Sequence, residues 1–173
     1  AHFPDGSSVS YAYGISGDTL TARVRDQEGK VKRTCKDTRG NIVRVEEELG
    51  GYAVTTRYQY NPVNEITKVT DDRGNTTSIT YDKMGRRMRI DNPDTGPTDY
   101  RYDLAGNLTS KITANLRAEG KAIKYVYWYN RLERTDYPHL HDVTYTYGEP
   151  SATYNRAGRV TAVDNGVVTD QFR

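Results

Sequence analysis

Several groups of residues have types and spacings that could support chemistry. His139 and His141 lie two residues apart, as two metal ligands on one side of a strand would. Both fall on turn positions of a repeated segment described below, so we interpret them as exposed turn residues. Glu46, Glu47 and Glu48 could supply paired carboxylates for acid–base catalysis. The run borders two glycines, however, and is more typical of a solvated strand end.

Oxygen-rich segments and the single thiol are weaker candidates. Residues 71–75 and 91–96 are rich in Asp, Asn and Gly, but neither segment has the alternating oxygen ligands or the distal Glu of an EF-hand, so turn formation explains both. Cys35 is the only cysteine and has no nearby His in the sequence. The sequence also lacks a phosphate-binding loop and a dinucleotide fingerprint. We therefore expect no enzyme activity, no metal site and no cofactor.

The composition favours strands without an ordinary aliphatic core. The 173 residues include 15 Tyr but only 2 Phe and 1 Trp, and the mean hydropathy is -0.87. Val, Ile, Leu and Phe together number 30, a share below the level of about 20% under which disorder becomes the default expectation. The net charge is only +2, and Tyr and Thr suit pleated, half-buried surfaces. Tyrosine is therefore expected to replace the missing aliphatic side chains.

Charge and hydropathy argue against two classes of partner. The isoelectric point of about 8.6 is below the value of about 9 that marks nucleic-acid binding. Arg101 lies between Tyr100 and Tyr102, but in a strand its side chain points away from both rings. No stretch approaches the ~18 apolar residues of a membrane-spanning helix. The chain begins with Ala1 and shows no signal-peptide pattern, so we interpret it as a piece of a longer protein.

Two series of residues repeat along the chain. The first is an acidic or amide residue, two variable residues, Gly, and then Arg or Asn. Its copies begin at Asp37, Asp82, Asp103 and Asn155, with a degenerate copy at Asn61 that has Asn64 in place of Gly. Asn61, Asp82 and Asp103 follow one another at intervals of 21 residues. The second series is Pro, six residues, Tyr, one residue and Tyr, and it begins at Pro4, Pro93 and Pro138.

Each repeat unit is typical of a β-hairpin. An Asp or Asn at the first turn position can bond its own backbone two residues on, and Gly at the fourth accepts the positive φ of a type I turn with a bulge. The flanking tyrosines alternate with other residues, which places them on one face of a strand. The residues expected to carry the repeat are, in the turns, Asp37, Gly40, Asp82, Gly85, Asp103, Gly106, Asn155 and Gly158, and, in the tyrosine rows, Tyr58, Tyr60, Tyr81, Tyr100, Tyr102, Tyr125, Tyr127, Tyr145 and Tyr147.

The fold class that follows is all-β, an array of antiparallel hairpins over residues 1–173 without a domain linker. The only candidate helix is residues 114–119, which is too short to be stable alone. We expect the tyrosine rows to form a ladder across neighbouring strands. Strands are predicted at 8–13, 19–25, 30–36, 41–48, 53–60, 65–70, 76–81, 86–91, 98–102, 107–113, 121–129, 132–137, 142–147, 159–163 and 167–172.

The repeat resembles a known family. Segments 81–86 and 102–107, together with the stretch YWYNRLERTDYPHLHDVTYTYG, are similar to the YD repeat of the Rhs (rearrangement hot spot) family, and the resemblance extends over residues 3–172. It implies a spiralling β-sheet shell, as in bacterial polymorphic toxins, the C components of ABC-type toxin complexes and teneurins. The chain departs from the pattern at 127–132, where a shortened copy lacks both Asp and Gly and predicts a tightened or redirected turn.

The resemblance also implies a role and partners. The chain would be a non-catalytic section of a shell wall that encloses a toxin or other polypeptide cargo, in a secreted or cell-surface protein of a bacterium. Its partners would be further repeats and a C-terminal cargo domain of the same polypeptide. The alternative is a carbohydrate-binding adhesive module, since exposed Tyr rings can stack on sugars. No nucleic acid and no membrane span are expected.

Overall fold

The computed structural model describes residues 1, 7–153 and 156–172, and these form two compact units. The first unit comprises Ala1–Gly85 and Asp91–Asp94, and the second comprises Arg86–Ile90 and Thr95–Arg173. The strands of the first unit are β1 (Ser10–Ser16), β2 (Thr19–Arg25), β3 (Val31–Lys36), β4 (Ile42–Leu49), β5 (Tyr52–Tyr60), β6 (Ile66–Thr70) and β7 (Thr76–Tyr81). Strand β8 (Arg87–Asn92) contributes residues to both units.

The second unit contains the remaining elements. They are β9 (Gly96–Tyr102), β10 (Leu108–Ile112), α1 (Ala114–Ala118), β11 (Ile123–Trp128), β12 (Arg131–Asp136), β13 (Val143–Tyr147), β14 (Val160–Asp164) and β15 (Thr169–Gln171). Each of the fifteen strands overlaps one strand expected from the sequence, and the predicted all-β fold is confirmed. Among the described residues, no helix is long and apolar enough to cross a membrane.

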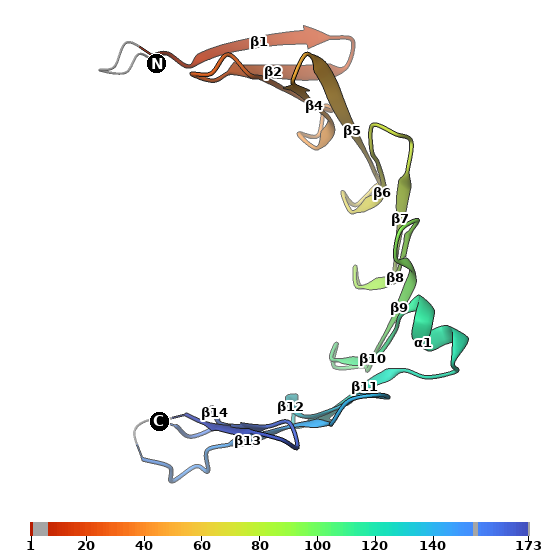
Figure 1. Cartoon of the computed structure of the whole chain (residues 1–173), viewed down its shortest axis with the longest axis vertical. Helices are drawn as coiled ribbons and strands as arrows, with labels where there is room; N and C mark the ends of the chain where they lie inside the picture. Colours follow the sequence, from red (N-terminus) through yellow and green to blue (C-terminus); the bar gives the residue numbers. More distant parts are fainter. Residues whose placement is uncertain (2–6, 154–155, 173) are drawn as a thin grey trace. The chain divides into compact units, whose positions relative to one another are not determined.

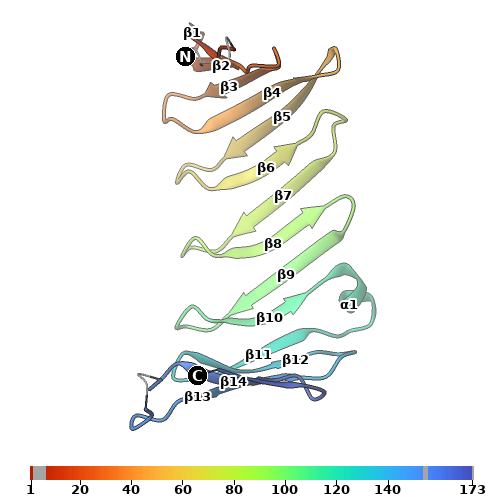
Figure 2. The same ribbon diagram turned by 60° about the vertical axis from the view of Figure 1, so that its left-hand side comes forward.

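The strands follow one another in the sheet in the order of the sequence. In the first unit every strand from β1 to β7 pairs antiparallel with the next, and in the second unit the same holds from β9 to β15. The zigzag of β3 to β7 is visible in Figure 2. Alternate turns of such a meander lie at the same edge of the sheet.

One edge carries the turns of the first repeat series. We call it the repeat edge, and it holds the turns at 37–41, 61–65 and 82–85 in the first unit and those at 103–107, 129–130 and 148–159 in the second. The other edge, which we call the opposite edge, carries the turns in between. The second series marks this opposite edge, because Pro93 and Pro138 lie in the turns that precede β9 and β13. Pro4 lies outside the described residues.

The short helix α1 interrupts the opposite edge between β10 and β11 (Figure 1). Thr113 caps its N-terminus, where the side-chain oxygen accepts a hydrogen bond from the Leu116 N–H. Gly120, with φ +67°, follows the helix and lets the chain turn toward β11.

The sheet separates side chains into two faces. Registered pairs place Tyr58 opposite Val69 and Tyr102 opposite Leu108, so aliphatic residues on even-numbered strands face tyrosines on odd-numbered strands. The expected ladder therefore alternates tyrosine with aliphatic residues instead of pairing Tyr with Tyr on neighbouring strands. In the described part of the chain, Trp128 and Tyr129 form the one pair of contacting aromatic rings.

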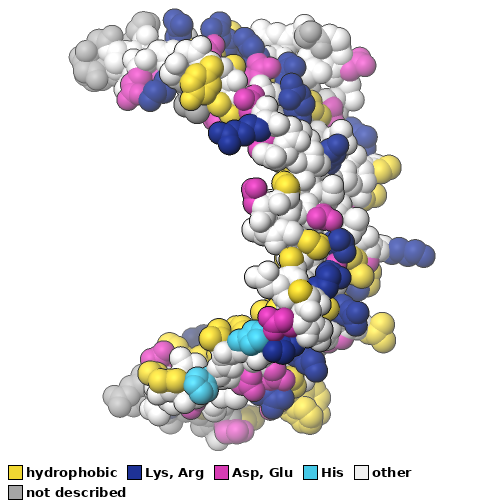
Figure 3. All heavy atoms as spheres, turned by 45° about the vertical axis from the view of Figure 1, so that its right-hand side comes forward, with side chains coloured by type: hydrophobic (Ala, Val, Ile, Leu, Met, Phe, Trp, Pro, Cys, Tyr) yellow, Lys and Arg dark blue, Asp and Glu magenta, His cyan; other side chains and the backbone are white. Residues whose placement is uncertain are grey.

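The sheet has no central core. Val31, Cys35 and Thr135, at 3%, 1% and 2% exposure, are the buried residues among those described. Figure 3 shows hydrophobic side chains, in yellow, as small separate groups among polar and charged ones. Hydrogen-bonded strand pairing and half-buried side chains therefore stabilise each unit, and local contacts at the turns gain importance.

Candidate functional site: the repeat edge

The turn at 37–41 shows how each repeat closes. The Asp37 carboxylate accepts hydrogen bonds from the N–H groups of Arg39 and Asn41, at 2.9 and 2.8 Å, and from the Asn41 side chain at 3.1 Å. The Gly40 N–H donates to the Asp37 carbonyl at 3.0 Å. Gly40 has φ +86°, in the left-handed region that favours glycine. One carboxylate thus satisfies three donors of a single tight turn.

The same arrangement recurs along the repeat edge. Asp103 accepts from the backbone and side chain of Asn107, at 2.8 and 2.9 Å, and Gly106 has φ +94°. Asp82 accepts from the Met84 N–H at 2.8 Å, and Gly85 has φ +77°. In the degenerate copy, Asn61 takes the place of Asp, and Asn64 has φ +65° where the other copies have Gly.

Two further copies of this turn lie at the opposite edge. Asp26 accepts from the N–H groups of Glu28 and Lys30, and Asp71 accepts from Arg73 and Asn75. The repeat series read from the sequence does not contain these copies, because its period of 21 residues counts the turns of one edge only. The recurring Asp-x-x-Gly spacing was the signal that could have found them.

The last two turns of the repeat edge differ from this pattern. Tyr129 and Asn130 form a two-residue turn with φ +45° and +61°. Of the two outcomes expected for the shortened copy, a tightened or a redirected turn, the structure shows the tightened one. In the longer loop at 148–159, Gly158 has φ +69° and its N–H donates to the Gly148 carbonyl at 2.8 Å. A Cβ on Gly148 would lie 2.2 Å from the Arg156 carbonyl oxygen, so only glycine fits there. Asn155, expected to start this turn, lies outside the described residues.

Neighbouring turns of the repeat edge are linked by the residue after the glycine. The Asn41 side-chain amide donates to Asn64 Oδ1 at 3.0 Å, and Asn107 donates in the same way to Asn130 Oδ1 at 2.9 Å. These links explain why Asn replaces Gly at 64 and 130, since the side chain tolerates positive φ and also accepts a bond from the preceding turn.

Other turns use different pairs for the same link. The Arg86 guanidinium donates to the Asp103 carbonyl at 3.0 Å and lies 4.8 Å from the centre of the Tyr102 ring. A Cβ on Gly85 would lie 2.7 Å from Glu65 Oε1, so the glycine makes room for the glutamate of the preceding turn. The residue at the fifth position of a turn, Glu65 or Arg86 here, therefore contacts the next turn along the repeat edge.

A tyrosine precedes four turns of the repeat edge and makes a second link between hairpins. The hydroxyl of Tyr81 donates to the Ile66 carbonyl at 2.8 Å, and that of Tyr102 donates to the Arg87 carbonyl at 3.0 Å. Tyr60 and Tyr147 make equivalent bonds of 2.8 Å, to the carbonyls of Ile42 and Leu132. The Tyr of the repeat thus has a hydrogen-bonding role that its spacing alone did not indicate.

A β-bulge follows the turn in these hairpins. Thr67, Thr109 and Thr161 are the extra residues, and each hydroxyl donates to a carbonyl of the paired strand at 3.2–3.3 Å. A bulge increases local twist and re-aims neighbouring side chains. Its position next to the tyrosine allows the phenol to reach the adjacent hairpin.

The remaining predicted tyrosines lie half-buried on the same face. Burial raises the pKa of Tyr125, and the neighbouring tyrosines 137, 127, 100 and 145 raise it further. Burial also raises the pKa of Tyr127, with a smaller effect from Asp103. The ring of Tyr145 lines a groove together with Tyr147.

Grooves open at the repeat edge where paired strands separate. One groove, of about 500 Å³, lies beside β6 and β7, and another, of about 440 Å³, lies beside β12 and β13. The two grooves have equivalent lining positions with different side chains. Glu65, Thr67 and Tyr81 of the first groove correspond to Arg131, Glu133 and Tyr147 of the second. The second groove also includes Trp128, which is 66% exposed.

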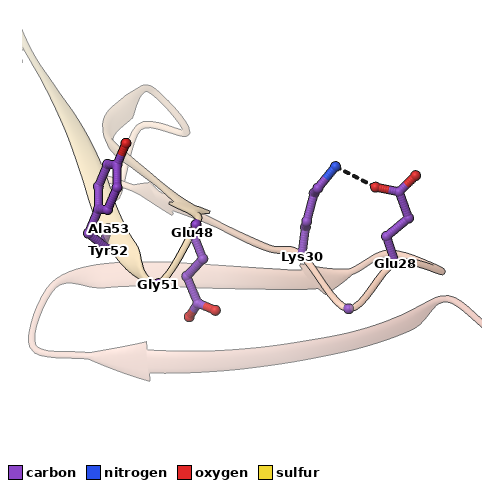
Figure 4. Close-up of a pocket in the computed structure, with 8 residues that line it drawn as sticks. Glu28, Lys30, Glu48, Gly51, Tyr52 and Ala53 are labelled. Carbon is purple, nitrogen blue, oxygen red and sulfur yellow. Dashed lines mark hydrogen bonds and ion pairs between the residues drawn. The ribbon is translucent and has the colours of Figure 1, made fainter.

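The residues considered for catalysis do not converge. His139 lies in the turn before β13, where its Nε2 pairs with Glu119 at 2.6 Å. Glu46 and Glu47 point to opposite faces of β4 and pair with Arg33 and Lys32. Figure 4 shows the pocket beside this strand, where Glu48 points away from the Lys30–Glu28 ion pair. Within the described residues, no three His, Cys, Asp or Glu side chains cluster as metal ligands.

The comparisons with known proteins agree with this geometry. Residues 60–97 match the family model of the RHS repeat, and they contain the turns at 61–65 and 82–85 with Tyr60 and Tyr81. The chain carries an RHS repeat. The expected resemblance to the Rhs family is therefore confirmed, and the hydrogen bonds of Tyr60 and Tyr81 are features of the matched segment. No curated protein matches the sequence significantly.

Solved structures share the fold of this chain. The TcdB2-TccC3 structure aligns with a TM-score of 0.69 and 15% identity over 93% of this chain and 10% of that chain. The TcdB2-TccC3-TEV structure aligns with a TM-score of 0.68 and 15% identity over 94% of this chain and 10% of that chain. A Photorhabdus luminescens Tc holotoxin pore with a mutated TccC3 aligns with a TM-score of 0.65 and 15% identity over 90% of this chain and 9% of that chain. At this identity the likeness concerns the fold, and the chain spans about a tenth of those chains.

Proposed function

We propose that this chain is a non-catalytic wall segment of an RHS-type β-shell that encloses a toxin or other polypeptide cargo. The observation that carries the proposal is the common fold over 93% of the chain with TcdB2-TccC3 and over 90% with a Photorhabdus luminescens Tc holotoxin pore that contains TccC3. The single array over residues 1–173 would then be one section of a longer sheet. Its partners would be further repeats and a cargo domain of the same polypeptide.

The local structure supports a structural role. A sheet without a core gains little from burial, and the turn-to-turn bonds of Asn41 and Asn107 and the phenol bonds of Tyr81 and Tyr102 join successive hairpins. Such links suit a wall that must hold its strands together while both faces stay open. By analogy with the Photorhabdus toxin, we propose a secreted or cell-surface-delivered bacterial protein.

Protease protection tests the proposal in the full natural polypeptide. We expect the cargo segment to resist limited proteolysis in the intact protein and to become sensitive when several turn glycines of the shell, Gly85 and Gly106 among them, are replaced with Val. A matched variant with changes at exposed Lys83 and Arg73 should keep the protection. A cargo segment that is digested equally in all three proteins would contradict enclosure.

A carbohydrate-binding role is the second candidate, and one observation favours it. Trp128 and Tyr129 are 66% and 83% exposed and form an edge-to-face pair with ring centres 5.0 Å apart, and Trp128 lines the groove beside β12 and β13. Exposed rings beside Arg131 and Glu133 could stack on a sugar and bond its hydroxyls. Binding to a glycan panel that Trp128→Ala abolishes would support this role, and uniformly negative panels would count against it.

A further inference from the structure

The face of the first unit turned away from the tyrosines carries five arginines. Registered pairs place Arg23 opposite Arg33 and Arg44 opposite Arg57, and Arg25 lies on the same face of β2 as Arg23. We call this set of residues the arginine face. On strands β2 to β5 this face also contains Glu46 and Glu48, so the cations on these four strands outnumber the acids by five to two.

The two arginine pairs place like charges opposite one another. Side chains directly opposite on paired strands have Cβ atoms about 4.5–5.5 Å apart, and like charges at that distance repel. Arg23 and Arg57 are exposed, and no described residue forms an ion pair with either of them. Their positions therefore call for an anionic group from outside the unit.

Glu46 shows which group fits between these guanidiniums. Its two carboxylate oxygens lie 2.6 Å from Arg33 and 3.1 Å from Arg44, so one carboxylate bridges two arginines. In the second unit, Asp99 is held in the same way between Arg89 and Arg117. A carboxylate supplied by a partner could bridge Arg44 and Arg57, and another could bridge Arg23 and Arg33, with charge-assisted bonds.

The surface between the arginines can receive such a partner. A depression of about 410 Å³ is lined by Thr19, Thr21, Cys35, Val43, Arg44 and Arg57. A second depression, of about 300 Å³, is lined by Ser10, Ala12, Arg23 and Arg25. Neither contains an aromatic ring, so neither offers the stacking platform that single-stranded nucleic acid uses.

We propose that the arginine face binds an acidic segment of polypeptide in an extended conformation. An extended chain places alternate side chains on one side about 6.6–6.8 Å apart. The two arginine pairs lie two strands apart in the sheet, so carboxylates four residues apart in an extended segment can reach one pair each. The small hydroxyl, thiol and methyl side chains between the arginines leave room for its backbone. This inference does not rest on the proposed shell role, because it concerns the chemistry of one face and not what a sheet encloses.

Binding of a fluorescent peptide of alternating Glu and Ser to the 173-residue chain tests this inference. We expect the peptide to bind at low salt, a Gln-Ser peptide not to bind, and Arg23→Gln with Arg57→Gln to weaken binding about tenfold or more. The matched control is Lys36→Gln with Arg73→Gln, which removes the same number of positive charges. Lys36 lies on the face of the sheet opposite the arginine face and Arg73 lies in the turn at 71–75, so binding should be unchanged.

The unfolding midpoint separates lost binding from lost structure. Because Arg23→Gln and Arg57→Gln relieve repulsion, the double variant should unfold at the same temperature as the unchanged chain or higher. An Arg23→Gln/Arg57→Gln variant that binds as well as the unchanged chain would overturn the proposal, as would the absence of peptide binding. Binding of heparin or polyphosphate without binding of the acidic peptide would also overturn it, in favour of a sulfated or phosphorylated polymer.

Discussion

The glycines of the repeat act through backbone conformation, which can be tested at one position. Gly106 has φ +94° and open space around it, so the strain of a side chain there comes from φ and not from a clash. We expect Gly106→Val to lower the free energy of unfolding by about 1–2 kcal/mol. Gly106→Asn should cost less, because Asn64 occupies the same turn position with φ +65°.

Thermal unfolding of these variants gives the measurement. His139→Ala is the comparison for a surface change, since it removes one exposed pair with Glu119 and should shift stability by less than about 0.5 kcal/mol. Equal melting temperatures for Gly106→Val and His139→Ala would show that the turn does not depend on the left-handed glycine.

Two tyrosines of strand β13 allow the contribution of the hydroxyl hydrogen bond to stability to be measured apart from that of the aromatic ring. Tyr147 donates to the Leu132 carbonyl at 2.8 Å, whereas no hydrogen bond from the hydroxyl of Tyr145 occurs among the described residues. We expect Tyr147→Phe to cost about 0.5–1.5 kcal/mol in urea unfolding and Tyr145→Phe to be close to neutral. A larger loss of stability in Tyr145→Phe than in Tyr147→Phe would contradict the proposed role of the phenol in joining hairpins.

At the scale of the turn, the Asp residues should make stability depend on acidity. The hydrogen bond from the Asn107 side chain lowers the pKa of Asp103, and that from Asn75 does the same for Asp71. A lowered pKa in the folded chain means that this stabilisation is complete above about pH 3.9 and is lost as the pH falls through the folded-state pKa.

Urea midpoints at about pH 6 and about pH 3 measure this effect. The double variant Asp71→Asn/Asp103→Asn should lose less stability between the two pH values than the unchanged chain, because the amide oxygen of Asn61 already accepts the N–H groups of Val63 and Glu65 in the same geometry. Asp170→Asn, on the exposed strand β15, serves as the control. An acid response that the double variant leaves unchanged would place the acid sensitivity elsewhere.

The elements were more predictable than the links between them. Gly, Asn and Asp punctuate the chain about every ten residues, and alternating Tyr marks strands such as β5, β9 and β13. The strand positions and the short helix near 114 therefore follow from local patterns. The bonds from Asn41 to Asn64 and from Tyr81 to Ile66 join residues 23 and 15 positions apart. They depend on how far a side chain reaches across the bulge, which residue spacing does not encode.

For the whole molecule, half-buried tyrosines should limit stability in alkali. Burial raises the pKa of Tyr125 and of Tyr60, so each holds its proton to higher pH in the folded chain than in the unfolded chain. The stabilisation is therefore complete below about pH 10 and is lost as the pH rises through the folded-state pKa. Tyrosinate absorbance recorded with the urea midpoint should show both changes together.

Substitution identifies the responsible rings. Tyr125→Phe should move the loss of stability to higher pH, whereas Tyr129→Phe, at a position that is 83% exposed, should leave it in place. If stability is lost at the same alkaline pH in Tyr125→Phe as in the unchanged chain, other titrating groups, such as lysines, control unfolding at high pH.

The alternation of turns between the two edges also constrains how such a chain can gain or lose length. Removing residues 61–81 would take out two strands and join Tyr60 to Asp82, which restores the Tyr-Asp-x-x-Gly sequence at the junction. Removing one strand would instead move every later turn to the wrong edge and reverse the direction of every later strand. Recombination between repeats therefore preserves the sheet when it adds or removes an even number of strands. Adding or removing an odd number would place every later turn at the wrong edge.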